Sequence, residues 1–179
     1  MPGKHVYVFS VTRVRIPFLP PDKSDSHMKT SYKIYILSIV ICLILGYVSG
    51  FAVKISDFSW YNSLHKPVFN PPRWVFAPVW TILYIMIGLS AVSILRSKNL
   101  YIKSLFVMQF ICNLLWTPLF FYYHKIDYAL YNIICLFVLL TLLLYRLYKD
   151  SSIFYLLLPY YLWVAFATML NYNIYIMNV

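Results

Sequence analysis

Residues 60–80 read WYNSLHKPVFNPPRWVFAPVW, a stretch with three tryptophans and four prolines. Proline fixes its backbone φ angle and has no N–H, so Pro67, Pro71 and Pro72 cannot lie inside a regular helix. Pro72 suits the first position of a following helix, where its missing donor is not needed. Pro78 lies about a turn and a half further on and should bend that helix. The stretch therefore predicts a rigid, irregular loop that leads into a helix.

The rest of the chain is strongly apolar. Of 179 residues, 62% are hydrophobic and 11% are charged, against about 45–50% and about 25% in soluble domains. A membrane-spanning helix needs about 20 mostly apolar residues. Five runs qualify, at about 34–53, 73–95, 104–123, 128–148 and 153–176. Short polar loops separate the last four runs and favour antiparallel packing of neighbouring helices. Residues 31–179 are therefore predicted to form an all-α integral membrane protein, a bundle of five transmembrane helices.

The proline-rich loop, residues 54–72, joins the first two runs. It should lie at the mouth of the bundle, where water can still satisfy irregular backbone. Tryptophans are routine at membrane interfaces, but that does not explain the proline framework, so we interpret the loop as a lid over a cavity between the helices. The candidate lid residues are Trp60, Lys66, Pro67, Pro71, Pro72 and Trp74. Since Trp74 and Trp80 are six residues apart, one can anchor at the interface while the other faces inward.

The net charge of +10 does not indicate nucleic-acid binding, because the basic residues lie between the apolar runs, as loop charges that set topology do. Only Lys54, Lys66, Arg73 and Lys125 of the 15 basic residues fall on the lid side. If insertion follows the ordinary rule, the N-terminus lies on the cytoplasm-like side. The C-terminus should then emerge beside the lid.

Residues 1–30 form a basic N-terminal extension of a different character. They lack the continuous apolar core and the cleavage site of a secretory signal. Three interpretations stay open: a targeting segment, an unstructured tail, or a sequence that precedes a true start at Met28.

Few residues inside the spans could carry chemistry. Charged side chains are nearly absent from them, and neither the three cysteines nor the four histidines have the spacing of a metal site. No metal and no cofactor is therefore predicted. Neutral polar residues do occur within the spans: Gln109, Asn113, Asn132, Thr168 and Asn171. They could form interhelical hydrogen bonds, each worth about 0.6 kcal/mol, or they could orient a ligand in an apolar pocket.

The first run contains Gly46 and Gly50, which are four residues apart. Such a pair lets another helix approach closely. It could serve a homodimer, but packing inside the bundle is the favoured interpretation.

Three stretches, taken in order, resemble one known family. Residues 60–84, WYNSLHKPVFNPPRWVFAPVWTILY, resemble the signature of the translocator protein family, also called TspO/MBR, tryptophan-rich sensory proteins or peripheral-type benzodiazepine receptors. Residues 109–121, QFICNLLWTPLFF, and 159–178, PYYLWVAFATMLNYNIYIMN, resemble two further patterns of that family. The resemblance extends over about 32–178 and leaves out the N-terminal extension.

The resemblance implies a five-helix bundle, often dimeric, with a ligand cavity capped by the loop between the first two helices. Family members bind tetrapyrroles such as protoporphyrin IX, and some bind cholesterol or synthetic benzodiazepine-site ligands. Trp80 and Trp163 match the two tryptophans that line the porphyrin site, and in some bacterial members these are linked to light-dependent porphyrin breakdown. Further positions match the pocket lining: Ala77, Asn113, Trp116, Ala167 and Leu170. With Gln109 and Asn171 from the polar set, these complete the candidate ligand site.

On this basis the expected function is a membrane receptor or carrier for tetrapyrroles, acting in sensing or transport. The alternative is a light- and oxygen-dependent porphyrin-degrading enzyme in which Trp80 and Trp163 are catalytic. The near absence of intramembrane charges argues against a coupled transporter. Tyr172 is not followed by a basic residue, which argues against cholesterol recognition. The expected location is a bacterial membrane or the mitochondrial outer membrane, among membrane lipids.

Overall fold

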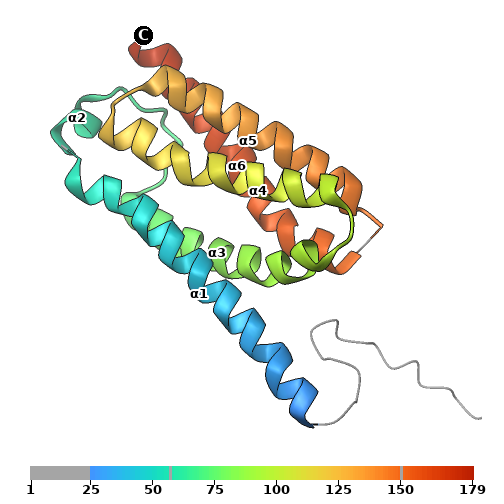
Figure 1. Cartoon of the computed structure of the whole chain (residues 1–179). Coiled ribbons are helices and arrows are strands. Elements are labelled where there is room, and N and C mark those ends of the chain that lie inside the picture. Colours follow the sequence, from blue (N-terminus) through green and yellow to red (C-terminus); the bar gives the residue numbers. More distant parts are fainter. Residues whose placement is uncertain (1–24, 57, 150) are drawn as a thin grey trace, which may run out of the picture.

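Helices make up nearly all of the computed structural model, which describes residues 25–56, 58–149 and 151–179. In chain order the elements are α1 Asp25–Ile55, α2 Phe58–Ser63, α3 Arg73–Arg96, α4 Leu100–Thr117, the π-helix η1 Pro118–Tyr122, α5 Ile126–Leu147 and α6 Ser151–Asn178 (Figure 1). Among the described residues, five of the helices are long and apolar enough to cross a membrane, with η1 continuing the span of α4. None of these residues forms a strand. The prediction of a five-helix membrane bundle is confirmed.

The helix pairs α4–α5 and α5–α6 are joined by short loops and pack closely, whereas α3 packs less on the next helix, α4, than on α1 and α6. α4 packs on α5, α5 on α6 and α6 on α3, while α1 packs mainly on the outer side of α3 (Figure 1). The hinge before α4 is capped by Asn99, whose side-chain oxygen accepts hydrogen bonds from the backbone N–H groups of Tyr101 and Ile102. This cap satisfies two of the donors that every helix start leaves free.

Glycines allow α1 to approach α3. A Cβ on Gly88 would lie 2.7 Å from the Cα atom of Ile39, and the hydroxyl of Ser38 donates a 2.8 Å hydrogen bond to the Gly88 carbonyl. A Cβ on Gly46 would overlap the ring of Tyr84. Gly50 has no such neighbour within 4 Å, so the expected use of the glycine pair in packing inside the bundle holds for Gly46 alone.

The π-helix η1 begins at a proline. Pro118 has no N–H, so the helix cannot form its usual bond to the carbonyl of Leu114, four residues earlier. The hydroxyl of Ser49 on α1 donates a 2.6 Å hydrogen bond to that carbonyl instead. In a membrane such a substitute matters, because lipid offers a freed backbone group no partner. The backbone then closes a wider turn, with the N–H of Tyr123 donating to the Pro118 carbonyl.

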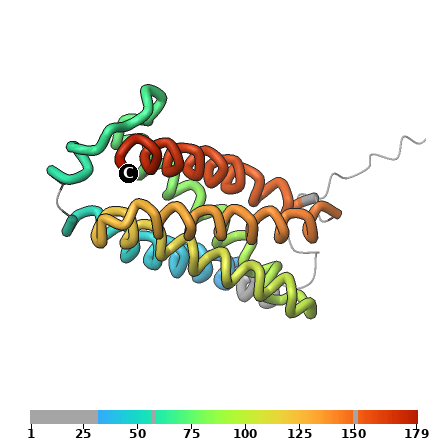
Figure 2. The backbone as a smooth tube through the Cα atoms, turned by 90° about the horizontal axis from the view of Figure 1, so that it is seen from above, coloured from blue at the N-terminus to red at the C-terminus, as the bar shows by residue number. Residues whose placement is uncertain are grey.

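The bounds of the elements differ in places from those of the apolar runs. α1 begins at Asp25, well before the expected start near residue 34, and α4 begins at Leu100 rather than at 104. Residues 1–24 of the predicted N-terminal extension lie outside the described residues. The lid segment and the end of α6 lie at the same end of the bundle, as expected (Figure 2).

Candidate functional site

Trp80 on α3 is the first of the two matched tryptophans, and its side chain is half-buried. Its ring lies 5.6 Å from the ring of Tyr84 and 6.4 Å from that of Tyr160 on α6. Both tyrosines are buried. Trp80 therefore lies at the seam between α3 and α6, supported by rings from both helices.

Trp163 on α6 lies on the same seam, closer to the lid. Its ring is 5.9 Å from Phe76 of α3 and 5.6 Å from Phe166. Phe166 in turn lies 6.5 Å from Phe69 of the lid segment. The indole N–H of Trp163 is buried and has no acceptor among the described residues. The aromatic row thus runs from the lid into the bundle and includes one unpartnered donor.

Two buried amides on α4 lie behind this row. The Tyr84 hydroxyl donates a 2.8 Å hydrogen bond to the side-chain oxygen of Asn113, and the Tyr160 hydroxyl donates an equally short one to Gln109. The NH₂ groups of both amides are buried and have no acceptor among the described residues. The sequence left interhelical bonding and ligand orientation as alternatives for these amides, and the structure is compatible with both. The amide oxygen accepts the interhelical hydrogen bond, and the amide nitrogen remains free to orient a ligand.

Trp116, which was matched to the pocket, and Asn171, which came from the polar set, form a hydrogen bond with each other. The indole N–H of Trp116 donates a 2.9 Å hydrogen bond to the side-chain oxygen of Asn171. The Asn171 NH₂ group reaches the carbonyl of Ile126 at 3.4 Å. The protein itself therefore uses the polar atoms of this pair to join α4, α5 and α6.

The other polar residues inside the spans also bond to the backbone. Asn132 on α5 donates to the Cys112 carbonyl of α4 at 2.8 Å, so it forms an interhelical link. Thr168 donates to the Val164 carbonyl one turn earlier on α6. Neither contact leaves an obvious role for these two side chains in ligand orientation.

The apolar positions of the predicted site are divided between surface and core. Ala167 and Leu170 on α6 are buried, whereas Ala77 on α3 is exposed. The structure therefore gathers Trp80, Trp163, Gln109 and Asn113 along the α3–α4–α6 interior and places Ala77 outside the core.

The lid segment is attached to the bundle through α2. Trp60 stacks on the imidazole of His124, with ring centroids 4.1 Å apart, and meets Phe120 of η1 edge-on. Buried Tyr61 packs on the same phenylalanine. The Lys66 ammonium lies 4.5 Å from the centre of the Tyr61 ring. The first half of the lid is therefore anchored on the π-helix and the turn after it.

Two basic side chains, Lys66 and Arg73, lie close to the ring of Tyr61 in the lid segment. The Arg73 guanidinium is 5.4 Å from the centre of the Tyr61 ring and also contacts the side-chain oxygen of Asn62. Partial burial and this neighbouring guanidinium lower the pKa of the Lys66 ammonium. The Lys66 ammonium also donates a 3.1 Å hydrogen bond to the Leu64 carbonyl. This bond ties the Lys66 side chain to the backbone of the lid.

The prolines of the lid differ in exposure. Pro67 is buried, Pro71 is half-buried and Pro72 is exposed at the start of α3. Trp74 is 75% exposed, in contrast to half-buried Trp80. This matches the expectation that one of the two indoles faces outward and the other inward.

The side chain of Asn178, near the end of α6, forms two hydrogen bonds with the backbone of His65 in the middle of the lid. Its side-chain oxygen accepts from the His65 backbone N–H, and its NH₂ group donates to the His65 carbonyl, both at 2.8 Å. One amide thus satisfies both polar groups of a backbone unit that no regular element holds. The lid is closed onto α6 by this clasp and by the contact of Phe69 with Phe166.

Asn178→Ala is expected to raise the hydrogen-exchange rate of the lid backbone around His65 about three- to tenfold, because two hydrogen bonds are lost. Asn173→Ala is the matched control, since that side chain bonds only to the Met169 carbonyl of its own helix. Exchange would be followed by mass spectrometry on peptides from the lid. Equal exchange rates in the two variants would contradict a stabilising role of the hydrogen bonds between Asn178 and His65.

The sequence did not single out Tyr84, Tyr160 or Asn178. For the tyrosines a signal existed: Tyr84 is four residues after Trp80, and Tyr160 is three before Trp163, so each shares a helix face with its tryptophan. Asn178 gave no signal, because its partner, His65, is distant in sequence.

These features define a class: a small, helical, multi-pass membrane protein with an aromatic seam under a proline-rich lid. Residues 38–177 match the model of the TspO/MBR family, and the chain belongs to that family. It is 36% identical to the tryptophan-rich protein TspO of Archaeoglobus fulgidus, over 80% of this chain and 95% of that protein. It is 31% identical to the translocator protein of Ovis aries, over 73% and 81% respectively. Protein CrtK of Rhodobacter capsulatus is 32% identical, over 69% and 81%.

Proposed function

We propose that this protein binds a tetrapyrrole of the protoporphyrin IX type against Trp80 and Trp163, beneath the lid of residues 54–72, and acts as a receptor or carrier for it. A flat, apolar macrocycle suits stacking on indole faces. The names of two relatives, tryptophan-rich sensory protein and translocator protein, support a role in sensing or transport.

One observation carries the proposal: three buried N–H donors along one aromatic seam have no acceptor in the described part of the chain. They are the indole N–H of Trp163 and the NH₂ groups of Gln109 and Asn113. Gln109 and Asn113 are one helical turn apart, and Gln109 is bonded to Tyr160, three residues before Trp163. An unpartnered buried donor is costly in a membrane. Ligand oxygens, such as the carboxylates of a porphyrin, would satisfy these donors and fix the ring in one orientation.

A second candidate function is light-dependent breakdown of the bound porphyrin, with dioxygen as the oxidant. The specific observation in its favour is that each of the two tryptophans lies among other aromatic rings: Trp80 contacts Tyr84 and Tyr160, and Trp163 contacts Phe76 and Phe166. Electron-rich rings beside an excited porphyrin are plausible electron donors. A receptor would bind porphyrin and leave it intact, so the two functions differ in what light does to the complex.

The experiment is a titration of the detergent-purified protein with protoporphyrin IX in the dark, followed by illumination in air. Saturable binding with porphyrin absorbance that stays constant in light supports the receptor or carrier. Porphyrin loss that stops in Trp163→Phe but continues in the matched control Trp74→Phe supports the enzyme. The absence of saturable binding would overturn both.

A further inference from the structure

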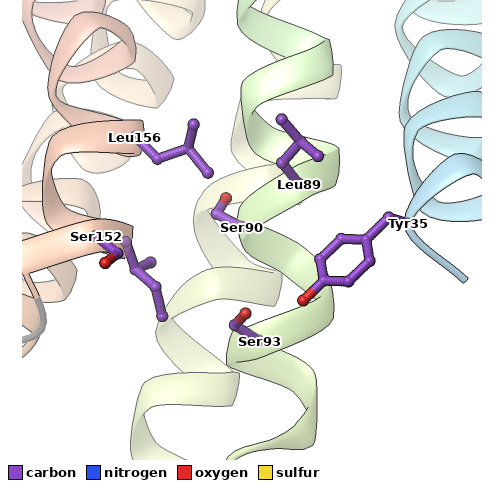
Figure 3. Close-up of a pocket in the computed structure, with 7 residues that line it drawn as sticks. Tyr35, Leu89, Ser90, Ser93, Ser152 and Leu156 are labelled. Atoms are coloured by element: carbon purple, nitrogen blue, oxygen red, sulfur yellow. The ribbon is translucent and has the colours of Figure 1, made fainter. Parts of the chain in front are cut away.

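A small pocket lies at the end of the bundle opposite the lid, between α1, α3 and α6 (Figure 3). Its volume is about 40 Å³, little more than the share of one water molecule in the liquid, which is about 30 Å³. Its lining includes Tyr35, Leu89, Ser90, Ser93, Ser152 and Leu156. Most of these side chains are hydroxylated, which is unusual inside a span of a chain this apolar.

Most of the hydroxyls are available to a ligand. Ser90 is buried and donates to the Ile87 carbonyl at 2.9 Å. By contrast, the hydroxyls of Tyr35, Ser93 and Ser152 make no hydrogen bond to any described residue. Serine in a helix commonly bonds back to a carbonyl one turn earlier, whereas these three half-buried hydroxyls are available to water or to a ligand in the cavity.

The pocket is closed on its inner side. One turn deeper on α1, the hydroxyl of Ser38 donates to the Gly88 carbonyl, and Gly88 contacts the backbone of Ile39. α1 and α3 therefore meet directly there, which closes the pocket between these two helices on the side toward Trp80.

The polarity of the lining changes along the membrane normal. Leu89 and Leu156 lie on the side toward the bundle interior, while Ser93 and Ser152 lie one turn closer to the helix ends (Figure 3). Basic residues follow further out: Arg96 is three residues beyond Ser93 on α3, and Lys149 is three residues before Ser152. Along both helices, apolar, hydroxylated and basic residues thus follow one another in the order in which a phospholipid presents acyl chains, glycerol esters and phosphate, although Asp150 stands beside Lys149 in the sequence.

We propose that this pocket binds an anionic phospholipid from the leaflet on the N-terminal side, with one oxygen of its glycerol-phosphate part inside the pocket and the rest at its mouth. Tyr35, Ser93 and Ser152 donate hydrogen bonds to its ester and phosphate oxygens. The first backbone N–H groups of α6 add donors there, because a helix start leaves them without internal acceptors. Arg96 and Lys149 supply the preference for negative charge. The pocket holds a group of about the size of one water molecule, so a single headgroup oxygen enters it, and the rest of the headgroup and the acyl chains lie along the outside of α1 and α6.

Native mass spectrometry of the protein, delipidated and then exposed to phosphatidylglycerol, phosphatidylcholine or inorganic phosphate, tests the proposal. We expect one retained phosphatidylglycerol, in preference to phosphatidylcholine. Ser93→Leu combined with Ser152→Leu should fill the pocket and lower that retention about tenfold, and Arg96→Gln should lower the preference for phosphatidylglycerol about fivefold. Thr141→Val on α5 is the control, because that exposed hydroxyl bonds only to its own helix.

Because the leucine variant could fail to fold, Ser93→Ala with Ser152→Ala removes the hydroxyls without adding bulk and should lower retention about threefold. Unchanged retention in this variant, with the helical circular dichroism of the wild type, would overturn the proposal. Retention of inorganic phosphate without retained lipid would also overturn it, since the ligand would then be a free anion. Binding of protoporphyrin IX is expected to be unchanged in all these variants, which separates failure here from failure of the proposed function.

Discussion

Gly46→Ala is expected to destabilise the bundle by about 1–3 kcal/mol, as overpacking of a filled core does. A Cβ at this position overlaps the ring of Tyr84. That ring flanks Trp80, and its hydroxyl bonds to Asn113, so a displaced Tyr84 disturbs the candidate site as well. We therefore expect weaker binding of protoporphyrin IX together with the loss of stability.

Gly50→Ala is the control for this prediction, one turn further along α1. No atom other than its own local backbone lies within 4 Å of a Cβ there. Alanine also favours a helix over glycine by up to about 1 kcal/mol, so this variant should be unchanged or slightly stabilised. Thermal unfolding in detergent and porphyrin titration measure both quantities. If Gly46→Ala unfolds and binds like Gly50→Ala, the close packing of α1 on Tyr84 is wrong.

Gln109→Leu is expected to cost about 1–3 kcal/mol of stability, because it deprives the fully buried Tyr160 hydroxyl of the acceptor on α4. It should also weaken porphyrin binding, since one of the three unpartnered donors disappears with the amide.

A double-mutant cycle with Tyr160→Phe isolates the contact. In membrane proteins such couplings average about 0.6 kcal/mol and reach about 1.7 kcal/mol, and we expect this buried pair in the upper part of that range. Asn132→Leu serves for comparison: its bond to the Cys112 carbonyl lies outside the seam, so it should affect stability and not porphyrin affinity. Additive effects of Gln109→Leu and Tyr160→Phe would contradict the coupling.

The five spans could be predicted from the sequence because their length and apolar character alone determine them. The irregular backbone at 67–72 could be predicted because proline excludes a regular helix there, whereas the helix α2 earlier in the same segment was not predicted. That Trp74 and Trp80 face different sides followed from their spacing, whereas which of the two faces outward did not. These features depend on local rules, which a single sequence contains.

The pairing of side chains across helices could not be predicted in the same way. A helix that is apolar on all sides gives no period that says which face meets a neighbour. Trp116 and Asn171 were therefore grouped with the ligand positions, although they bond to each other. For the same reason the roles of Tyr84 and Tyr160 as partners of the α4 amides were missed. The π-helix at Pro118 depends on a serine of another helix, Ser49, and no local pattern indicates that.

The most direct test of the account is the dissociation constant for protoporphyrin IX in the dark, followed by the fluorescence of the porphyrin itself. It should be measured for the wild type, for Trp80→Ala combined with Trp163→Ala, and for Trp74→Ala. If the macrocycle stacks on the two seam indoles, the double variant should bind about tenfold more weakly. Trp74→Ala, which removes an indole that is 75% exposed, should bind within about twofold of the wild type. Equal affinities for all three proteins would contradict a porphyrin site at the α3–α6 seam.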